Sequence, residues 1–158
     1  MKTLVFLLSA FFLVSIASAD PFVVIVRHAE RDNNDPKDPD ITATGRTRAE
    51  ILAKMLKNAG ISAIFVTEFR RTQETAAPLS KSIGVTPIVV GGKDTSALMA
   101  KLDQVTGNAL VVAHGNTIPD IVKALGIDAS IQIPDEDYSD LFVVTLGNKP
   151  QLLRLRYP

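Results

Sequence analysis

Blocks of apolar residues alternate along the chain with segments of mixed polarity, and their periodicity predicts strands and helices in turn. Residues 22–26 form a continuous apolar, mostly β-branched run, as is typical of a strand buried on both faces of a sheet. Five further runs are predicted to be strands: 62–66, 87–90, 109–113, 141–146 and 152–155. Between them, four segments carry apolar residues at helical spacing: 42–56, 70–83, 95–105 and 117–125. This order predicts an α/β domain of three layers, α/β/α, with a mostly parallel sheet and an antiparallel end.

Residues at the ends of these segments support the assignment. Thr42 is suited to cap the first helix, and Gly84 and Gly126 follow the second and fourth helices. Gly147-Asn148 predicts a hairpin between the last two strands. No internal repeat or second domain is evident, so residues 20–158 are expected to form one domain.

The first nineteen residues have the pattern of a secretory signal peptide. Lys2 precedes an apolar run over 4–16, and Ala17-Ser18-Ala19 is a small-residue cleavage site. The whole stretch from Thr3 to Ala19, about seventeen residues, is at the short end of the roughly 17–25 residues that span a membrane, and the polar Asp20-Pro21 follows it. We therefore expect cleavage near Ala19 and export to the periplasm or the exterior, without a stable membrane anchor.

Composition adds little about partners. The chain has 17 basic and 17 acidic side chains, a balance that gives no support for nucleic acid or an anionic membrane surface as a partner. It contains no cysteine, so an exported domain of this size has to be stabilised by its apolar core rather than by disulfides. No pattern predicts an oligomeric state.

The chain contains two histidines, and each follows a predicted buried strand. Arg27-His28 ends the first strand, and His114-Gly115 follows the fourth. In open α/β sheets, ligand crevices form at such strand ends. Two imidazoles with two or more guanidiniums around one crevice would bind an anion, and phosphate suits the planar, paired hydrogen bonds of arginine.

Four segments give the chain a resemblance to the histidine phosphatase superfamily, which has the phosphoglycerate mutase-like fold. In order, they match the family's Arg-His-Gly/Ala opening, its Leu-Thr-x-x-Gly-x-x-Gln-Ala segment, its Ser-x-x-x-Arg-Ala-x-Gln-Thr-Ala segment and its second-histidine segment: 27–29, 41–49, 67–76 and 111–116. Arg48 replaces the glutamine of the second segment. The short chain and its Arg-His-Ala form resemble small members that act on phosphohistidine protein.

The resemblance implies roles for the matching residues. His28 would be the nucleophile that forms a phosphohistidine intermediate. The phosphate pocket would be completed by three further side chains: Arg27, Arg71 and His114. Asn34 lies where many members place a phosphate-contacting Asn, and Asn33 is the alternative if the register of the loop shifts. The resemblance implies neither a cofactor nor a metal.

The chemistry of phosphoryl transfer agrees with these roles. Its transition state spreads charge over the equatorial oxygens, so catalysis consists mainly of positioning and cationic stabilisation. A neutral imidazole at His28 can attack in line and leave again, which splits one displacement into two. His114 would donate a further hydrogen bond if it keeps its proton while His28 gives up its own. That asymmetry predicts a bell-shaped or acid-skewed rate profile.

The general acid has no single candidate in the sequence. Many family members place a Glu between the third strand and the next helix, and here the only carboxylate near that place is Asp94. Asp94 is equally suited to cap the following helix, and both roles can hold at once. Glu30 and Glu68 are weaker candidates. Without an acid, the favoured substrates would have good leaving groups, such as phosphohistidine, acyl phosphates or pyrophosphate.

Three polar features have simpler interpretations. Arg70 lies about 100° from Arg71 around the helix axis, so Arg71 is assigned to the pocket and Arg70 to its rim or a surface ion pair. The loop 32–40 does not match a calcium-binding loop, because Lys37 stands at the sixth position, where an EF-hand has Gly. The acidic segment 135–137 is expected to be a turn, with a place at the border of the pocket as the alternative.

The sequence therefore predicts an exported, metal-independent phosphatase that hydrolyses phosphomonoesters or phosphoramidates through phospho-His28. Its substrate would be a small phosphorylated molecule or a phosphoprotein. The alternative is a module of the same fold that binds phosphate or phosphoglycans with weak or no turnover, which the absence of a clear Glu acid favours.

Overall fold

The computed structural model describes residues 20–158, so the predicted signal peptide lies outside the described residues. Six strands form one sheet: β1 (Phe22–Arg27), β2 (Ile61–Val66), β3 (Ile88–Val89), β4 (Asn108–Ala113), β5 (Asp140–Thr145) and β6 (Gln151–Arg156). Four helices connect them: α1 (Ala43–Leu56), α2 (Arg70–Ile83), α3 (Thr95–Leu102) and α4 (Ile118–Ala124). No helix of the described residues is long and apolar enough to cross a membrane. The predicted order of elements is confirmed.

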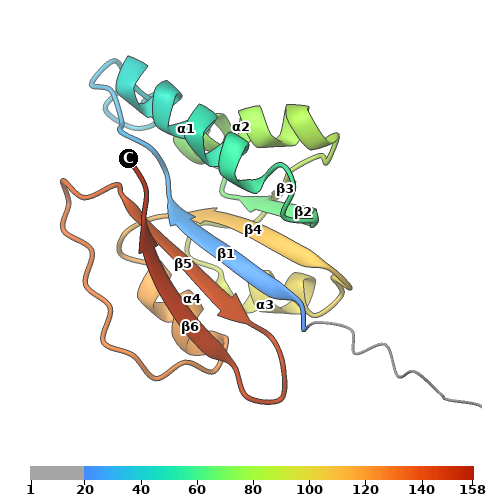
Figure 1. Ribbon diagram of the computed structural model, residues 1–158. Helices are drawn as coiled ribbons and strands as arrows, with labels where there is room; N and C mark the ends of the chain where they lie inside the picture. Colours follow the sequence, from blue (N-terminus) through green and yellow to red (C-terminus); the bar gives the residue numbers. More distant parts are fainter. Residues whose placement is uncertain (1–19) are drawn as a thin grey trace, which may run out of the picture.

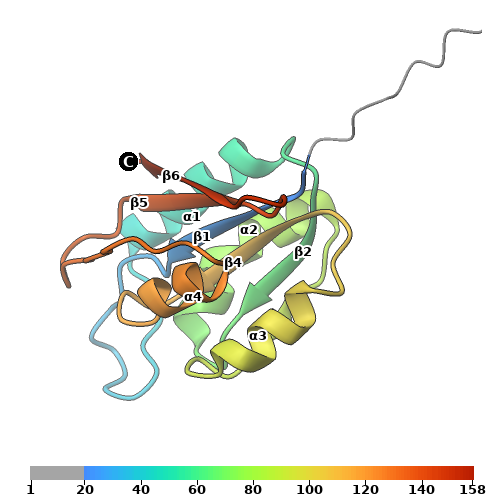
Figure 2. The ribbon, with the colours of Figure 1, turned by 90° about the horizontal axis from the view of Figure 1, so that it is seen from below.

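The sheet has the predicted mixed character. Its strand order is β3-β2-β4-β1-β5-β6, with the first four strands parallel and the last two antiparallel to their neighbours. Helices α1 and α2 cover one face and α3 and α4 the other (Figures 1 and 2). Because successive side chains of a strand point to opposite faces, β1 contributes Val23 and Ile25 to one apolar cluster and Val24 and Val26 to the other.

The ends of the elements explain where the prediction and the structure differ. Thr42 caps α1 by accepting the N–H of Gly45 at 3.0 Å, and Gly84 ends α2 in the left-handed conformation at φ 72°. Helix α3 ends before the predicted residue 105, because the chain tightens into a turn in which the N–H of Val105 bonds to the carbonyl of Leu102. Strand β3 is shorter than predicted because, as an edge strand, it pairs with only two residues of β2.

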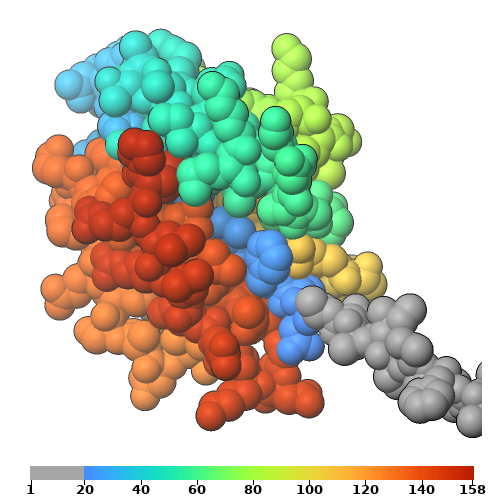
Figure 3. Space-filling view, in the orientation of Figure 1, coloured from blue at the N-terminus to red at the C-terminus, as the bar shows by residue number. Residues whose placement is uncertain are grey.

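The other edge of the sheet is the C-terminal strand β6, which lies at the front of the surface in Figure 3. Leu153 and Leu155 are paired with Val143 and Leu141 of β5 and remain 54% and 42% exposed. Helix α1 covers the central strands on this face and leaves β6 open.

The register of the central strands brings the two histidines together. Arg27 lies opposite Ala113 in the parallel pair of β1 and β4, and the N–H of His28 donates to the carbonyl of Ala113 at 2.9 Å. Strands β2 and β3 run in the same direction as β1 and β4, so the residues that follow all four parallel strands lie along the carboxyl-terminal side of the sheet. Open α/β sheets bind ligands on this side, at the carboxyl ends of their strands.

Candidate active site

His28 lies at the base of this edge and is 4% exposed. Its Nδ1 is 2.8 Å from the carbonyl oxygen of Ala29. A carbonyl only accepts hydrogen bonds, so a neutral ring carries its proton on Nδ1 and its lone pair on Nε2. Burial, followed by the nearby His114 and the charges of Arg71 and Arg27, lowers the pKa of His28 to about 3, even though the Ala29 bond opposes this shift. At neutral pH, His28 is therefore an uncharged imidazole with a basic Nε2.

His114 lies beside His28, with the ring centroids 5.4 Å apart. Its Nε2 is 3.1 Å from the Thr67 hydroxyl, which in turn contacts the Thr72 hydroxyl at 3.0 Å. Burial and then the charge of Arg71 lower the pKa of His114 to about 4. The expectation that His114 keeps its proton therefore does not hold at neutral pH for the protein by itself. A phosphate dianion beside the ring would favour its charged form and raise this pKa.

The segment after His28 is held by residues of the matched motifs. The N–H of Ala29 donates to the Thr75 hydroxyl at 2.9 Å. Glycine is required at Gly45, because a Cβ there would lie 2.8 Å from the carbonyl oxygen of Glu30. The Glu30 carboxylate is held by Arg48 in a paired contact with distances of 2.7 and 3.0 Å. Glu30 is thus a structural partner of Arg48 rather than a free acid.

Arg27 is 7% exposed, and one side of its guanidinium is bound by the chain. Its Nη1 donates to the carbonyl oxygens of Pro134, Asp135 and Asp137 at 3.0, 2.8 and 3.1 Å. The guanidinium carbon lies 4.3 Å from the centre of the Tyr138 ring. The acidic segment therefore borders the pocket through its carbonyl groups, while the Asp137 carboxylate is engaged with Ser139 and Arg156.

Arg71 lies at the start of α2, with its guanidinium carbon 4.3 Å from the centre of the Phe69 ring. Burial lowers the pKa of Arg71, but a guanidinium stays charged at any physiological pH. In the described part of the chain, three buried side-chain polar atoms have no hydrogen-bond partner: Arg27 Nε, Arg71 Nε and Tyr157 Oη. Two of the three belong to the arginines that the sequence assigns to phosphate.

Two aromatic rings that the sequence analysis did not identify flank the histidine pair. The Tyr138 ring is 6.0 Å from His28, and the Phe69 ring is 5.3 Å from His114. Phe69 could have been suspected from its place two residues before Arg71. Tyr138 gave no such signal, because its position depends on the path of an irregular segment.

Arg70 forms ion pairs with three carboxylates of the acidic loop 32–40. Its guanidinium lies 3.5 Å from the carboxylates of Asp35 and Asp38 and 2.8 Å from that of Asp40. Arg70 is therefore in surface ion pairs, one of the two places that the sequence offered. Within residues 20–158, no group of three or more His, Cys, Asp or Glu side chains is arranged to hold a metal ion.

The structure does not bring Asn34 into the site. Its amide nitrogen donates to the Asp40 carboxylate at 2.7 Å, and its oxygen accepts the N–H of Asp40 at 3.2 Å. Both polar atoms of the Asn34 side chain are therefore bonded to Asp40 within the same loop. The neighbouring Asn33 instead lines an open hollow together with Arg31 and Arg71.

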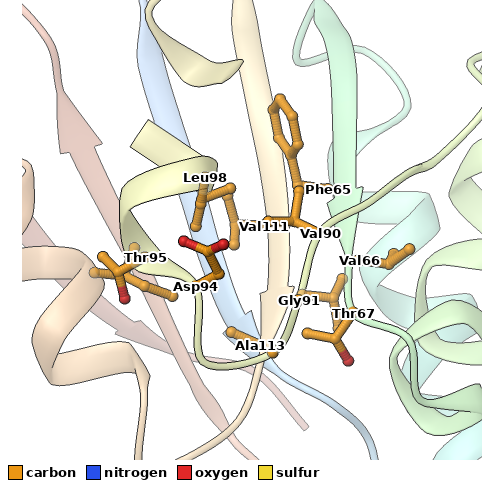
Figure 4. Close-up of a pocket in the computed structure, with 13 residues that line it drawn as sticks. Phe65, Val66, Thr67, Val90, Gly91, Asp94, Thr95, Leu98, Val111 and Ala113 are labelled. Atoms are coloured by element: carbon orange, nitrogen blue, oxygen red, sulfur yellow. The ribbon is translucent and has the colours of Figure 1, made fainter. Parts of the chain in front are cut away.

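Asp94 serves as the cap of α3, where its Oδ1 accepts the N–H of Ala97 at 2.9 Å. Figure 4 shows Asp94 on the helix side of a hollow and Thr67 at the end of the strand, with Gly91 between them. The capping role is thus present. The carboxylate that the structure brings to the second histidine belongs instead to Glu68, which accepts the N–H of Gly92 at 2.7 Å.

Comparison with known proteins agrees with this architecture. The sequence profile of the Histidine phosphatase superfamily (branch 1) matches residues 23–92. No curated protein matches the chain in sequence.

Solved structures of three phosphatases have a similar fold. The protein histidine phosphatase SixA complexed with tungstate superposes with a TM-score of 0.70 and 19% identity, covering 85% of this chain and 96% of that one. A putative alpha-ribazole-5'-P phosphatase from Escherichia coli K-12 has a TM-score of 0.68 and 15% identity, covering 87% and 97%. The mycobacterial glucosyl-3-phosphoglycerate phosphatase has a TM-score of 0.66 and 16% identity, covering 87% and 99%. At these identities the likeness establishes the fold.

Proposed function

We propose that this chain, whose residues 23–92 match the profile of the histidine phosphatase superfamily, is a phosphatase that works through a phosphohistidine intermediate on His28. The observation that carries the proposal is the pair of buried arginine Nε–H groups without a protein partner, on Arg27 and Arg71. Buried donors are costly unless they are bonded, so two of them beside one neutral imidazole favour a site made for an anion.

The proposed reaction has two displacements. Arg27 and Arg71 hold the phosphoryl oxygens, and His28 Nε2 attacks phosphorus in line while the bond to the leaving oxygen breaks. The proton stays on Nδ1, which donates it in a hydrogen bond to the carbonyl of Ala29 and so keeps the ring oriented. Water then attacks phosphorus, the phosphorus–nitrogen bond breaks, and His28 regains its lone pair.

The proposed substrates are phosphomonoesters or phosphoramidates, carried by a small molecule or a protein. The similar structures are phosphatases named for protein histidine, α-ribazole 5'-phosphate and glucosyl-3-phosphoglycerate. The substrates in these names share a phosphoryl group and differ in the group that leaves. The names therefore support recognition of the phosphoryl group, and we assign this chain no particular leaving group.

We also propose that the protein is exported after cleavage near Ala19, on the basis of the N-terminal sequence alone. Expression of the full chain in a bacterial host, followed by mass determination of the mature N-terminus, tests this part. A mature protein that begins at Asp20 is the expected result. An uncleaved protein that remains in the cytosol would contradict it.

The central experiment compares residues 20–158, which contain the whole described fold, with the variant His28→Asn. Hydrolysis of para-nitrophenyl phosphate should fall by about 10³-fold or more, because the variant cannot form the covalent intermediate. Circular dichroism shows whether the variant is folded, and a chelator should leave the wild-type rate unchanged. Acid-labile phosphate on the wild type during turnover is expected. Tungstate binding without turnover of any ester would instead favour the binding module, and full activity in His28→Asn would exclude the proposed nucleophile.

A further inference from the structure

Cleavage of a phosphate ester produces an alkoxide unless a proton reaches the leaving oxygen. The groups at the centre of the site are poor sources of that proton. The guanidiniums keep their protons, the lone pair of His28 Nε2 is used for the attack on phosphorus, and Nε2 of His114 is in contact with the Thr67 hydroxyl at 3.1 Å. The proposed reaction therefore requires another acid close to the phosphate.

Glu68 is the carboxylate that the structure places beside His114. It comes two residues after β2 ends, and its Oε2 accepts the N–H of Gly92 in the next loop of the same edge at 2.7 Å. A Cβ on Gly92 would lie 3.2 Å from His114 Nε2 and 3.4 Å from Glu68 Oε2, so imidazole and carboxylate flank the same glycine. The negative charge of Glu68 acts on His114 and on Arg71, where it partly opposes the lowering of both pKa values that burial causes.

The surroundings of Glu68 leave room for the departing group. Glu68 and Phe69 line an open hollow of about 430 Å³ together with residues 91–94. The charged side chains that share this hollow are Lys93 and Asp94. Gly92 lines this hollow, and its Cβ position lies 3.2 Å from His114 Nε2, so the hollow opens next to the second histidine.

The other carboxylates near the site are engaged elsewhere. Asp94 caps α3, Glu30 is paired with Arg48, and Asp137 is bonded to Ser139 and Arg156. Glu68, like Asp94, is held through one oxygen by a backbone N–H, which leaves its second oxygen for a proton. Glu68 differs from Asp94 in its partner, because the Cβ position of Gly92 lies 3.2 Å from His114 Nε2.

We propose that Glu68 is the general acid of the reaction, an inference that rests on the proposed function. In the first displacement, the carboxyl group of Glu68 gives a proton to the leaving oxygen as the phosphorus–oxygen bond breaks and the bond to His28 forms. In the second, the Glu68 carboxylate takes a proton from the attacking water as the phosphorus–nitrogen bond breaks. The acid is thereby regenerated, and phosphate is released.

The test compares wild type and Glu68→Gln on two esters with different leaving groups, para-nitrophenyl phosphate and β-glycerophosphate. Gln keeps an oxygen for the N–H of Gly92 but has no acidic proton. The kcat/KM of the variant should fall by about 10²-fold or more on β-glycerophosphate, whose alkoxide needs protonation, and by less than about fivefold on the activated ester. The matched control Glu50→Gln, at an exposed position of α1, should change the kcat/KM of both substrates by the same small factor.

Three results would overturn this assignment. Equal losses on the two esters in Glu68→Gln would indicate a structural role, and no loss on either would indicate none. A wild type that cleaves only the activated ester would show that no general acid operates. These failures are distinct from failure of the proposed function, in which the wild type forms no phosphohistidine and cleaves neither ester, and with which this assignment would also fall.

Discussion

Arg27 and Arg71 flank the histidine pair in similar settings, yet the chain binds them differently. Each guanidinium carbon lies 4.3 Å from the centre of an aromatic ring, and each has a buried Nε without a partner. Nη1 of Arg27 is bonded to three backbone carbonyls, whereas the carboxylate nearest to Arg71 is that of Asp38 at 3.8 Å. Arg27 therefore fastens an irregular segment to the site as well as leaving its Nε for the proposed phosphate. Arg71 leaves its Nε for the proposed phosphate and holds little else.

This difference shows that equivalent chemistry at a site need not mean equivalent energetics in the fold. Truncation of Arg27 would leave the carbonyls of 134, 135 and 137 without their donor. Buried polar groups left without a partner cost about 1–3 kcal/mol each, although solvent can compensate those near the surface. Truncation of Arg71 creates no comparable deficit, because an ion pair as long as 3.8 Å at a partly open site contributes little.

Arg27→Gln should have the larger effect, on activity and stability together. The kcat/KM for para-nitrophenyl phosphate should fall by about 10³-fold or more, because both the phosphate contact and the position of Tyr138 are lost. The free energy of unfolding in urea should fall by about 2–4 kcal/mol. Arg27→Lys is the control, since it keeps the charge and loses the planar pattern of donors. Unchanged stability in Arg27→Gln would show that the segment 134–138 does not depend on this anchor.

Arg71→Gln should lower activity without a comparable loss of stability. Its kcat/KM should fall by about 10²–10³-fold, the loss typical of one group that stabilises charge in the transition state. Its unfolding free energy should stay within about 1 kcal/mol of the wild type. Arg70→Gln is the matched control on the neighbouring position and should leave kcat/KM within about threefold. A fall in stability as large as that of Arg27→Gln would remove the distinction between the two arginines.

The sequence predicted the parts of the site that follow from periodicity. The apolar runs gave the strands, and the rule for strand ends brought His28 and His114 to one edge, where the register of β1 and β4 places them side by side. The helical angle between Arg70 and Arg71 separated the surface ion pair from the pocket. In each case the information is local to one element.

The features that escaped prediction depend on loops that meet in space. Arg27 is anchored by a segment more than 100 residues away, whose irregular path has no periodicity. Asn34 is withdrawn by its mutual contacts with Asp40. The sequence named Glu68 only as a weaker acid candidate, because its place near His114 depends on two loops that meet at Gly92. The low pKa of His114 follows mainly from burial, which sequence spacing does not reveal.

The smallest expected effect concerns the proton on His114. Arg71 lowers the pKa of His114 more than Arg27 does, so Arg71→Gln should raise it from about 4 by the larger step, as measured by NMR titration of the ring. The sign for stability follows by linkage. The folded-state pKa values of His28 and His114 lie below 6.5, so the unfolded chain binds protons first and stability declines as pH falls from about 6.5 toward 4 and 3.

In Arg71→Gln this decline should be shallower than in the wild type, and Arg27→Gln should lie between them. Urea unfolding at pH 7 and pH 5 measures the difference. An equal rise in the pKa of His114 in both variants would mean that the two arginines act on the ring from equivalent positions. A larger rise in the pKa of His114 in Arg27→Gln than in Arg71→Gln would reverse the comparison. Arg27, the arginine that is bonded to backbone carbonyls, would then be the one that mainly lowers the pKa of His114.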